Sequence, residues 1–172
     1  SEIAAPRWRI KEWDYYAVLS DDQQFAIAIT VADLGYVGMF ALCFIDLASG
    51  QYQQLDSLAL LPMGKTLLPA VNQHGNIVHN SKTLSVQIDM QEGSRRLRFS
   101  APNFTTADGR QGISGDLLLQ QPADLESMNI TSAWAENPKA FYYNCKINCL
   151  PTSGSFTLGQ QTHQLDPKRD SA

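Results

Sequence analysis

Hydrophobic and polar residues alternate along many short stretches of this chain. Period-two alternation is typical of a strand with one buried face, because successive side chains of an extended chain point to opposite sides. The clearest cases are residues 25–31, 84–90 and 141–149. Gly, Pro, Asn and Asp punctuate the stretches, and no long helical period appears. The pattern predicts an all-β, antiparallel fold of about ten strands, either a barrel or a half-barrel or sandwich.

The other expected strands can be placed from the same pattern. In residues 7–19 the apolar positions change parity midway, which predicts a bulge or twist near Glu12 and Trp13. Pro102 is expected to end a strand that begins at Arg95. Loops are expected at 61–70 and 72–76. The remaining strands are predicted at residues 36–47, 51–61, 77–79, 113–121, 125–131, 155–158 and 162–165.

Residues 141–149 form the most informative of these strands. One predicted face is apolar and dry; it carries Phe141, Tyr143, Cys145, Ile147 and Cys149. The other face carries directional hydrogen-bonding groups, namely Tyr142, Asn144, Lys146 and Asn148. These four residues either hold the polar head of an amphipathic ligand or make hydrogen bonds within the fold.

Length and charge restrict the classes of function. The 172 residues predict one domain, and a net charge of −4 gives no basic surface. The densest basic cluster, at Arg95, Arg96 and Arg98, is interpreted as a solvated strand edge. Nucleic acid is therefore not an expected partner.

Three cysteines, at positions 43, 145 and 149, are too few for a disulfide framework and are interpreted as packing thiols. No apolar run is long enough to span a membrane, and residues 1–6 contain no apolar signal-peptide core. Together these features predict a cytoplasmic protein without a membrane span.

Motifs for metals and cofactors are missing from the sequence. His74 and His79 lie five positions apart, which suits neither a strand nor a helix metal pair, and His163 is expected to be exposed. No Gly-rich phosphate loop and no nucleophile elbow occurs. Neither a metal nor a cofactor is predicted.

Two carboxyl groups lie among aromatic residues. Asp14 and Asp33 are candidate catalytic acids, because a carboxyl held against aromatic rings is desolvated and keeps its proton more readily. The alternative is that both accept backbone hydrogen bonds at turns or bulges. The surrounding aromatic residues are candidate ligand-binding groups: Trp13, Tyr15, Tyr16 and Tyr36.

Several of these stretches resemble an uncharacterised domain-of-unknown-function family. They are Lys11–Tyr16, Ala32–Tyr36 with Gly38, Leu61–Pro62 with Gly64, Gln120–Asp124 and Lys139–Gly154. The Glu-Trp-Asp-Tyr-Tyr string at 12–16 is also distantly similar to lipocalin-like families related to carotenoid 1,2-hydratase and tocopherol cyclase. That resemblance implies a lipocalin-like barrel and an isoprenoid-type ligand.

The resemblance also implies a missing part. Family members continue past the point that matches Asp166–Pro167 into a strand with a Trp-Gly-Arg-Gly-Val-Trp-like motif. They also begin with a Cys- and Gly-containing segment upstream of Trp8. The chain is therefore expected to be about half of a usual member, with a second polypeptide or a missing C-terminal half as its partner.

Three functions follow as alternatives. The first is binding of a hydrophobic or amphipathic small molecule, which predicts an enclosed cavity. The second is a hydratase- or cyclase-type enzyme with Asp14 or Asp33 as its acid. The third is a structural β module, which predicts an exposed apolar face or an unpaired sheet edge. If Lys146 lies inside a barrel, it should pair with Asp14 or Asp33.

Overall fold

A computed structural model describes residues 3, 5–62, 68–69 and 74–172 of the chain. Apart from a 3-10 turn at Arg7–Arg9 (η1), the regular structure consists of strands. They are β1 (Glu12–Ser20), β2 (Phe25–Asp33), β3 (Val37–Asp46), β4 (Tyr52–Leu60), β5 (Gly75–Asn80), β6 (Ser85–Gln91), β7 (Ser94–Thr105), β8 (Gln111–Gln120), β9 (Ser127–Trp134), β10 (Asn137–Ile147), β11 (Thr152–Leu158) and β12 (Gln161–Leu165). The predicted all-β fold is confirmed.

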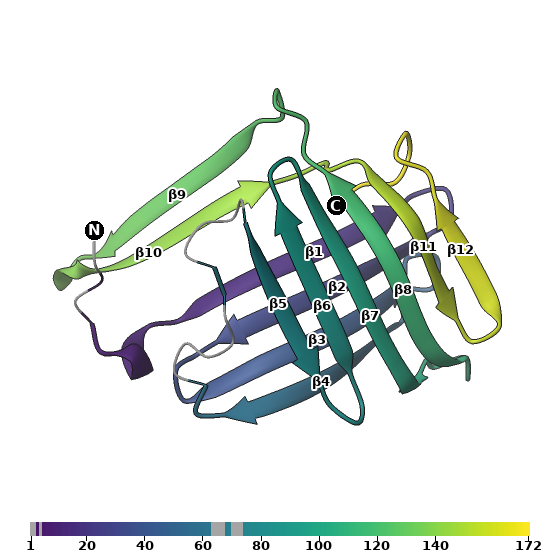
Figure 1. Cartoon of the computed structure of the whole chain (residues 1–172), viewed down its shortest axis with the longest axis horizontal. Coiled ribbons are helices and arrows are strands. Elements are labelled where there is room, and N and C mark those ends of the chain that lie inside the picture. Colours follow the sequence, from purple (N-terminus) through teal and green to yellow (C-terminus); the bar gives the residue numbers. More distant parts are fainter. Residues whose placement is uncertain (1–2, 4, 63–67, 70–73) are drawn as a thin grey trace.

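The strands form two stacked antiparallel sheets and one separate hairpin. Sheet A has the order β1-β2-β3-β4, and sheet B has the order β12-β11-β8-β7-β6-β5. Figure 1 shows sheet B lying across sheet A, with the hairpin β9–β10 projecting beyond the stack. The sheets are not closed into a barrel, so the architecture is the open sandwich among the predicted alternatives.

Large apolar side chains fill the space between sheets A and B. Sheet A contributes alternate residues of β2 and β3, such as Ile27, Ile29 and Leu42, which are almost completely buried. Sheet B contributes residues such as Leu97 and Leu117. Period two therefore holds on both sides of the core, as expected for two sheets that pack face to face.

Two histidines pack against aromatic rings at opposite edges of sheet B, one on β5 and one on β12. The His79 ring on β5 stacks on Phe40 of β3 with 3.9 Å between centroids, and its Nε2 lies 2.8 Å from the Ser57 hydroxyl. The His163 ring on β12 stacks on Phe156 at 4.6 Å, and its Nδ1 lies 3.2 Å from Oε1 of Gln23. His163 is half-buried, so the expectation that it is exposed was wrong.

The structure corrects two strand boundaries. The change of parity near Trp13 comes from the turn η1, which places Trp8 outside the strand, and the register of β1 with β2 is unbroken from Glu12. Pro102 does not end β7, because the strand passes through it at a register shift between Ala101 and Thr105. A missing amide hydrogen is tolerated at such an irregularity. The loops expected at 61–70 and 72–76 lie partly outside the described residues.

The predicted dry face of residues 141–149 is largely exposed. Phe141 and Tyr143 keep 49% and 56% of their surface open, because β10 pairs only with β9 and no third layer covers them among the described residues. Cys149 is exposed and lies outside the strand with φ of 62°, so it is not a packing thiol. The other two cysteines, Cys43 and Cys145, are half-buried.

Candidate functional site

Strand β1 divides the predicted site between two sides of sheet A. Trp13 and Tyr15 point away from the core and are exposed, whereas Tyr16 points into the core and is buried. Asp14 points the same way as Tyr16 and hydrogen bonds to it. The predicted ligand-binding and catalytic residues of this strand therefore belong to two separate places.

On the outer side, an aromatic pair joins β1 to the projecting hairpin. The Trp13 and Tyr142 rings stack with centroids 5.8 Å apart and an interplanar angle of 28°. Nδ2 of Asn144 donates to the Tyr142 hydroxyl over 2.7 Å. Three of the predicted ligand-binding residues thus meet at one point, with apolar ring faces next to an oriented amide.

The other predicted residues of this group lie elsewhere. Lys146 and Asn148 are exposed, and no ion pair joins Lys146 to a carboxylate among the described residues, so its predicted pairing with Asp14 or Asp33 is not found. Tyr36 lies in the turn between β2 and β3, where Nζ of Lys11 lies 4.1 Å from the centroid of its ring.

On the inner side, a polar group interrupts the apolar core. The Tyr16 hydroxyl donates to Oδ2 of Asp14 over 3.4 Å. The guanidinium of Arg95, buried on the inner face of β7, donates to Oε1 of Gln121 over 2.7 Å and lies close enough to influence both Asp14 and Tyr16. The Tyr16 hydroxyl also lies 3.7 Å from Sδ of Met90. These residues bring β1 of sheet A and β7 of sheet B together.

Burial decides the protonation of this group. Desolvation raises the pKa of Asp14, while the Tyr16 hydrogen bond and the positive charge of Arg95 oppose that rise. Desolvation also raises the pKa of Tyr16, and the neighbouring carboxylate adds to the effect. Tyr16 therefore remains a hydrogen-bond donor, and Asp14 holds a proton at higher pH than an exposed aspartate. Chemically, this is a carboxyl group that can serve as a weak acid.

Asp33 has a local structural role. It is buried at the end of β2, and its Oδ1 accepts the Gly35 amide hydrogen over 2.8 Å. Gly35 has φ of 81°, and a Cβ atom there would meet the Trp8 backbone at 2.7 Å. Asp33 thus fixes a turn that only glycine fits, as in the turn alternative of the sequence analysis.

Arg95 is the functional candidate that the sequence interpretation missed. The arginine cluster was placed at a solvated strand edge, but β7 lies inside sheet B between β6 and β8, and Arg95 is only 5% exposed. The alternation of residues along β7 indicates that Arg95 is buried. Arg95 shares odd positions with Leu97 and Phe99, whereas Arg96 and Arg98 alternate with them and form ion pairs on the outer face.

The outer faces of the two sheets differ in chemistry. Sheet B carries ion pairs there, with Arg96 bound to Asp116 and Arg98 bound to Asp89. The outward-facing residues of sheet A are apolar or aromatic, except for Thr30, Gln54 and Asp56. We call this surface the apolar face; it consists of Trp13, Tyr15, Ala17, Leu19, Ala26, Ala28, Ala32, Val37, Met39, Ala41, Cys43, Ile45, Tyr52, Leu58 and Leu60 together with those three polar residues.

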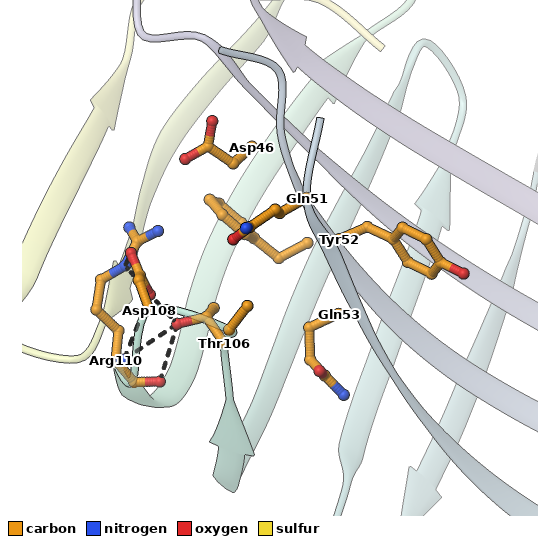
Figure 2. A pocket seen from close by; sticks show the side chains of 9 residues that line it. Asp46, Gln51, Tyr52, Gln53, Thr106, Asp108 and Arg110 are labelled. Atoms are coloured by element: carbon orange, nitrogen blue, oxygen red, sulfur yellow. Dashed lines mark hydrogen bonds and ion pairs between the residues drawn. The ribbon is translucent and has the colours of Figure 1, made fainter. Parts of the chain in front are cut away.

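A small hollow of about 20 Å³ opens to solvent between the β3–β4 turn and the β7–β8 connection. Figure 2 shows that Thr106, Asp108 and Arg110 on one side of the hollow are bonded to one another. Nε of Arg110 lies 2.9 Å from Oδ2 of Asp108, and the same guanidinium lies over the Phe44 ring. This ion pair and the Thr106 hydroxyl lower the pKa of Asp108 to about 2. The group locks the connection between β7 and β8.

Metal and membrane sites are not found in the described part of the chain. Over residues 3, 5–62, 68–69 and 74–172, His, Cys, Asp and Glu form no cluster of three that could hold a metal ion. In the same residues, no helix has the length and hydropathy needed to cross a bilayer.

One family model matches the chain over residues 1–172, and its description is Domain of unknown function (DUF2804). Searches of curated proteins and of solved structures found no match. The distant likeness to lipocalin-like families therefore stays a prediction.

Proposed function

The chain belongs to the DUF2804 family, and from its geometry we propose that it is a β module that binds a second, apolar β-sheet through the apolar face of sheet A. The observation that carries the proposal is the difference between the two outer faces. Sheet B has a solvated outer face with ion pairs, whereas large apolar side chains of sheet A face solvent.

The size and composition of the apolar face support a protein partner. Leu58 and Leu60 on β4 are 66% and 86% exposed, and Tyr15 on β1 is 60% exposed, so apolar residues lie open at both edges of the sheet. Contiguous apolar patches of more than a few hundred Å² on soluble proteins mark interaction sites. A small molecule prefers a concave pocket, but a second sheet packs on a broad apolar surface at a distance of about 10 Å.

The sandwich interior supports the same choice. Apolar side chains from both sheets occupy the space in which a barrel would hold its ligand, and residues such as Ile29, Leu42 and Leu97 are essentially inaccessible there. The interior therefore acts as a folding core, and the recognition surface lies outside it.

Native mass spectrometry of the protein purified from its host tests the proposal. A companion polypeptide should co-purify with the unaltered chain. Met39→Lys and Leu58→Lys, which change opposed positions of the apolar face, should weaken the complex at least about tenfold, because each buries a charge. Val78→Lys, at a half-exposed position on the outer face of sheet B, is the matched control. A chain without a companion, or equal binding by all three variants, would overturn the proposal.

A hydrophobic or amphipathic small molecule is the second candidate. The observation that favours it is the group of Trp13, Tyr142 and Asn144, where stacked rings lie beside an amide. Solvent extraction of the purified protein, followed by mass spectrometry, should then release a ligand that Trp13→Ala loses. Trp8→Ala, at an exposed tryptophan of η1, should retain it. Equal ligand content in both variants would exclude this candidate.

An acid role for Asp14 is retained within this second candidate as a hypothesis. It is supported by the burial that raises the pKa of the carboxyl and by the Tyr16 hydroxyl bound to it. If a released ligand is turned over, Asp14→Asn should abolish turnover while ligand binding remains.

A further inference from the structure

Residues 170–172 form a segment between the two sheets, and Ser171 makes isolated β-bridges to Leu19 and Pro151. Ser171 exchanges both backbone hydrogen bonds with Leu19 at the end of β1, at 2.8 and 3.2 Å. On its other side the Leu150 amide donates to the Ala172 carbonyl over 2.8 Å, and the Thr152 amide donates to the Asp170 carbonyl over 2.9 Å. The pairing is antiparallel on both sides. Ser171 therefore occupies a pairing position beside the end of β1, on the side away from β2.

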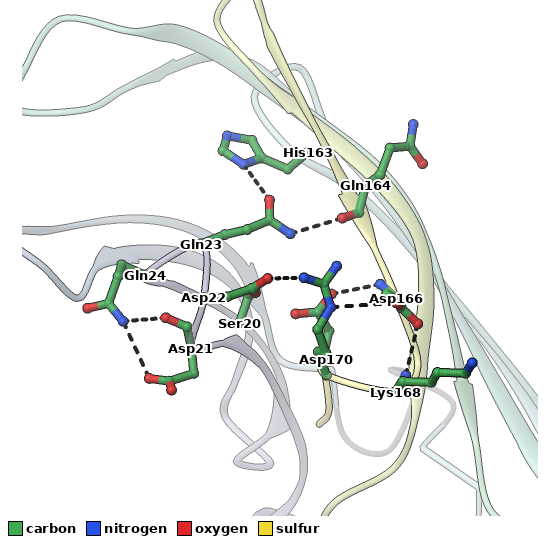
Figure 3. A network of polar contacts seen from close by, with 11 residues as sticks. Ser20, Asp21, Asp22, Gln23, Gln24, His163, Gln164, Asp166, Lys168 and Asp170 are labelled. Carbon is green, nitrogen blue, oxygen red and sulfur yellow. Dashed lines mark hydrogen bonds and ion pairs between the residues drawn. The ribbon is translucent and has the colours of Figure 1, made fainter.

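A polar network fixes the position of residues 170–172. Asp170 is fully buried, and its Oδ2 accepts the Asp166 amide hydrogen over 2.7 Å. Arg169 forms ion pairs with Asp22 and Asp166, which tie the segment to the β1–β2 turn. Figure 3 shows Gln23 of the same turn reaching His163 and the Gln164 carbonyl on β12. Residues 170–172 are thus held firmly in line with the edge of β1.

From Glu12 to Val18, the edge of β1 that faces away from β2 has no strand partner in the described part of the chain. Because the amide and carbonyl of Leu19 point toward Ser171, the same groups of every second residue point the same way. Ala17, Tyr15 and Trp13 therefore direct their amide hydrogens and carbonyls away from β2. The intervening residues, such as Tyr16, bond to β2 instead.

Strand β1 also lacks most of the features that normally protect a sheet edge. Exposed edges are usually blocked by proline, lysine, a bulge or a very short strand. The nine residues of β1 include no proline and no lysine, and their register with β2 has no shift. The one protective feature present is a pair of acidic side chains, Glu12 and Asp14, at inward-facing positions. The edge is therefore long, regular and open to pairing.

We propose that the edge of β1 accepts one further strand, supplied by a second polypeptide and running antiparallel to β1 from the position of Ala172 toward the level of Trp13. This inference rests on the proposed function and specifies how the partner is held. Backbone hydrogen bonds to Ala17, Tyr15 and Trp13 supply affinity, as in other cases of strand addition.

The register defines the chemistry of the added strand. Residues opposite Ala17, Tyr15 and Trp13 place their side chains on the apolar face, so alternate positions of the strand are apolar. The far edge of the strand faces the hairpin β9–β10, whose Tyr142 reaches Trp13. The same partner can thus add a strand at the edge and cover the apolar face.

Residue-resolved amide exchange by NMR tests the edge in the chain alone. The amides of Trp13, Tyr15 and Ala17 should exchange at least about 100-fold faster than those of Asp14, Tyr16 and Val18, because only the second group bonds to β2. Equal protection of both groups would overturn the proposal, since the edge would already be paired.

A tethered strand tests acceptance directly. Eight alternating Thr and Val residues are added after Ala172, where the tether removes most of the cost of association. The first and third added residues then lie opposite Ala17 and Tyr15, and exchange at those two amides should slow at least about tenfold. A control with proline at the first and third added positions should leave exchange unchanged, and equal exchange in both extended chains would overturn the proposal.

The two proposals can fail separately. A companion polypeptide that binds the apolar face but leaves the amides of Tyr15 and Ala17 unprotected would overturn the strand proposal alone. Protection by the tethered strand in a chain that has no companion would overturn the proposed function and the second polypeptide as the source of the strand, and would leave the edge of β1 as a strand acceptor.

Discussion

The Trp13 ring stacks on the Tyr142 ring with 5.8 Å between centroids, and this contact links sheet A to the hairpin β9–β10. The hairpin forms a separate two-stranded sheet, and most of its side chains are exposed. An isolated two-stranded hairpin is marginally stable in water. Its position relative to the sandwich therefore depends on side-chain contacts of this kind.

Replacing Trp13 should release the hairpin. An aromatic pair contributes about 1 kcal/mol beyond the area that it buries, so Trp13→Ala should increase limited proteolysis within residues 127–147 about fivefold. Trp134→Ala is the control, because Trp134 lies on β9 and is 56% exposed. Equal cleavage of both variants would show that the Trp13–Tyr142 contact does not hold the hairpin.

Removing the buried cation should destabilise the sandwich. Arg95→Met leaves Asp14 without its neighbouring positive charge and removes the hydrogen bond to Gln121, and the loss of a buried polar partner costs about 1–3 kcal/mol. Arg96→Met removes an exposed ion pair with Asp116, which should cost less than about 1 kcal/mol. Urea unfolding measures both free energies.

A double variant identifies the cause of that loss. If the uncompensated carboxylate is responsible, Arg95→Met with Asp14→Asn should be more stable than Arg95→Met alone. A double variant that is no more stable would place the effect in packing instead.

Stability should fall on mild acidification. Burial lowers the pKa of His79 and of His163 from the usual 6.5, and the charge of Arg110 lowers that of His163 further. As pH falls, the two histidines therefore bind protons in the unfolded chain before they do so in the folded protein. Their contribution to stability is fully present above pH 6.5, the pKa in the unfolded chain, and is lost as pH falls through their lower pKa values in the folded protein. Urea unfolding at pH 7.5, 6.5 and 5.5 should show this trend. His79→Phe with His163→Phe should flatten it, and an unchanged slope in that double variant would exclude the histidines as its cause.

One glycine of β11 should tolerate no side chain. Gly154 has φ of 109°, and a Cβ atom there would lie 2.2 Å from the Asp116 carbonyl oxygen. Gly154→Ala should therefore cost at least about 3 kcal/mol, which exceeds the 1–2 kcal/mol typical of a left-handed conformation alone. Gly50, with φ of 71° and open space around it, provides the control for the backbone cost. Similar melting temperatures for Gly154→Ala and Gly50→Ala would contradict the steric explanation.

Period two located the strands well, because alternation reports directly on a face that is buried. The same alternation places Arg95 on the buried face of β7, because Arg95 lies two residues before Leu97 and four before Phe99. Charge was weighted above parity, and so the buried arginine was interpreted as solvated. A charged residue on an apolar parity is better interpreted as a buried group with a partner.

Other features depend on contacts distant in sequence, which alternation does not encode. The pairing of Ser171 with Leu19 and the stacking of His163 on Phe156 arise from tertiary structure. The exposure of Phe141 and Tyr143 likewise follows from the absence of a third layer over β10 in the described residues. The sequence pattern correctly grouped these two side chains on one face, but whether another layer covers that face is a tertiary property.

The side chains of the apolar face differ in height, because β2 contributes alanines to it. Ala26, Ala28 and Ala32 form a low row along the second strand, and taller side chains such as Tyr15 and Met39 rise on the neighbouring strands. These alanines are only 4–6% exposed, so the side chains on the neighbouring strands supply most of the accessible area of the apolar face. In the proposed complex, a partner sheet would therefore rest on the rows of side chains from β1 and β3 that flank β2, and the direction of these rows would orient it.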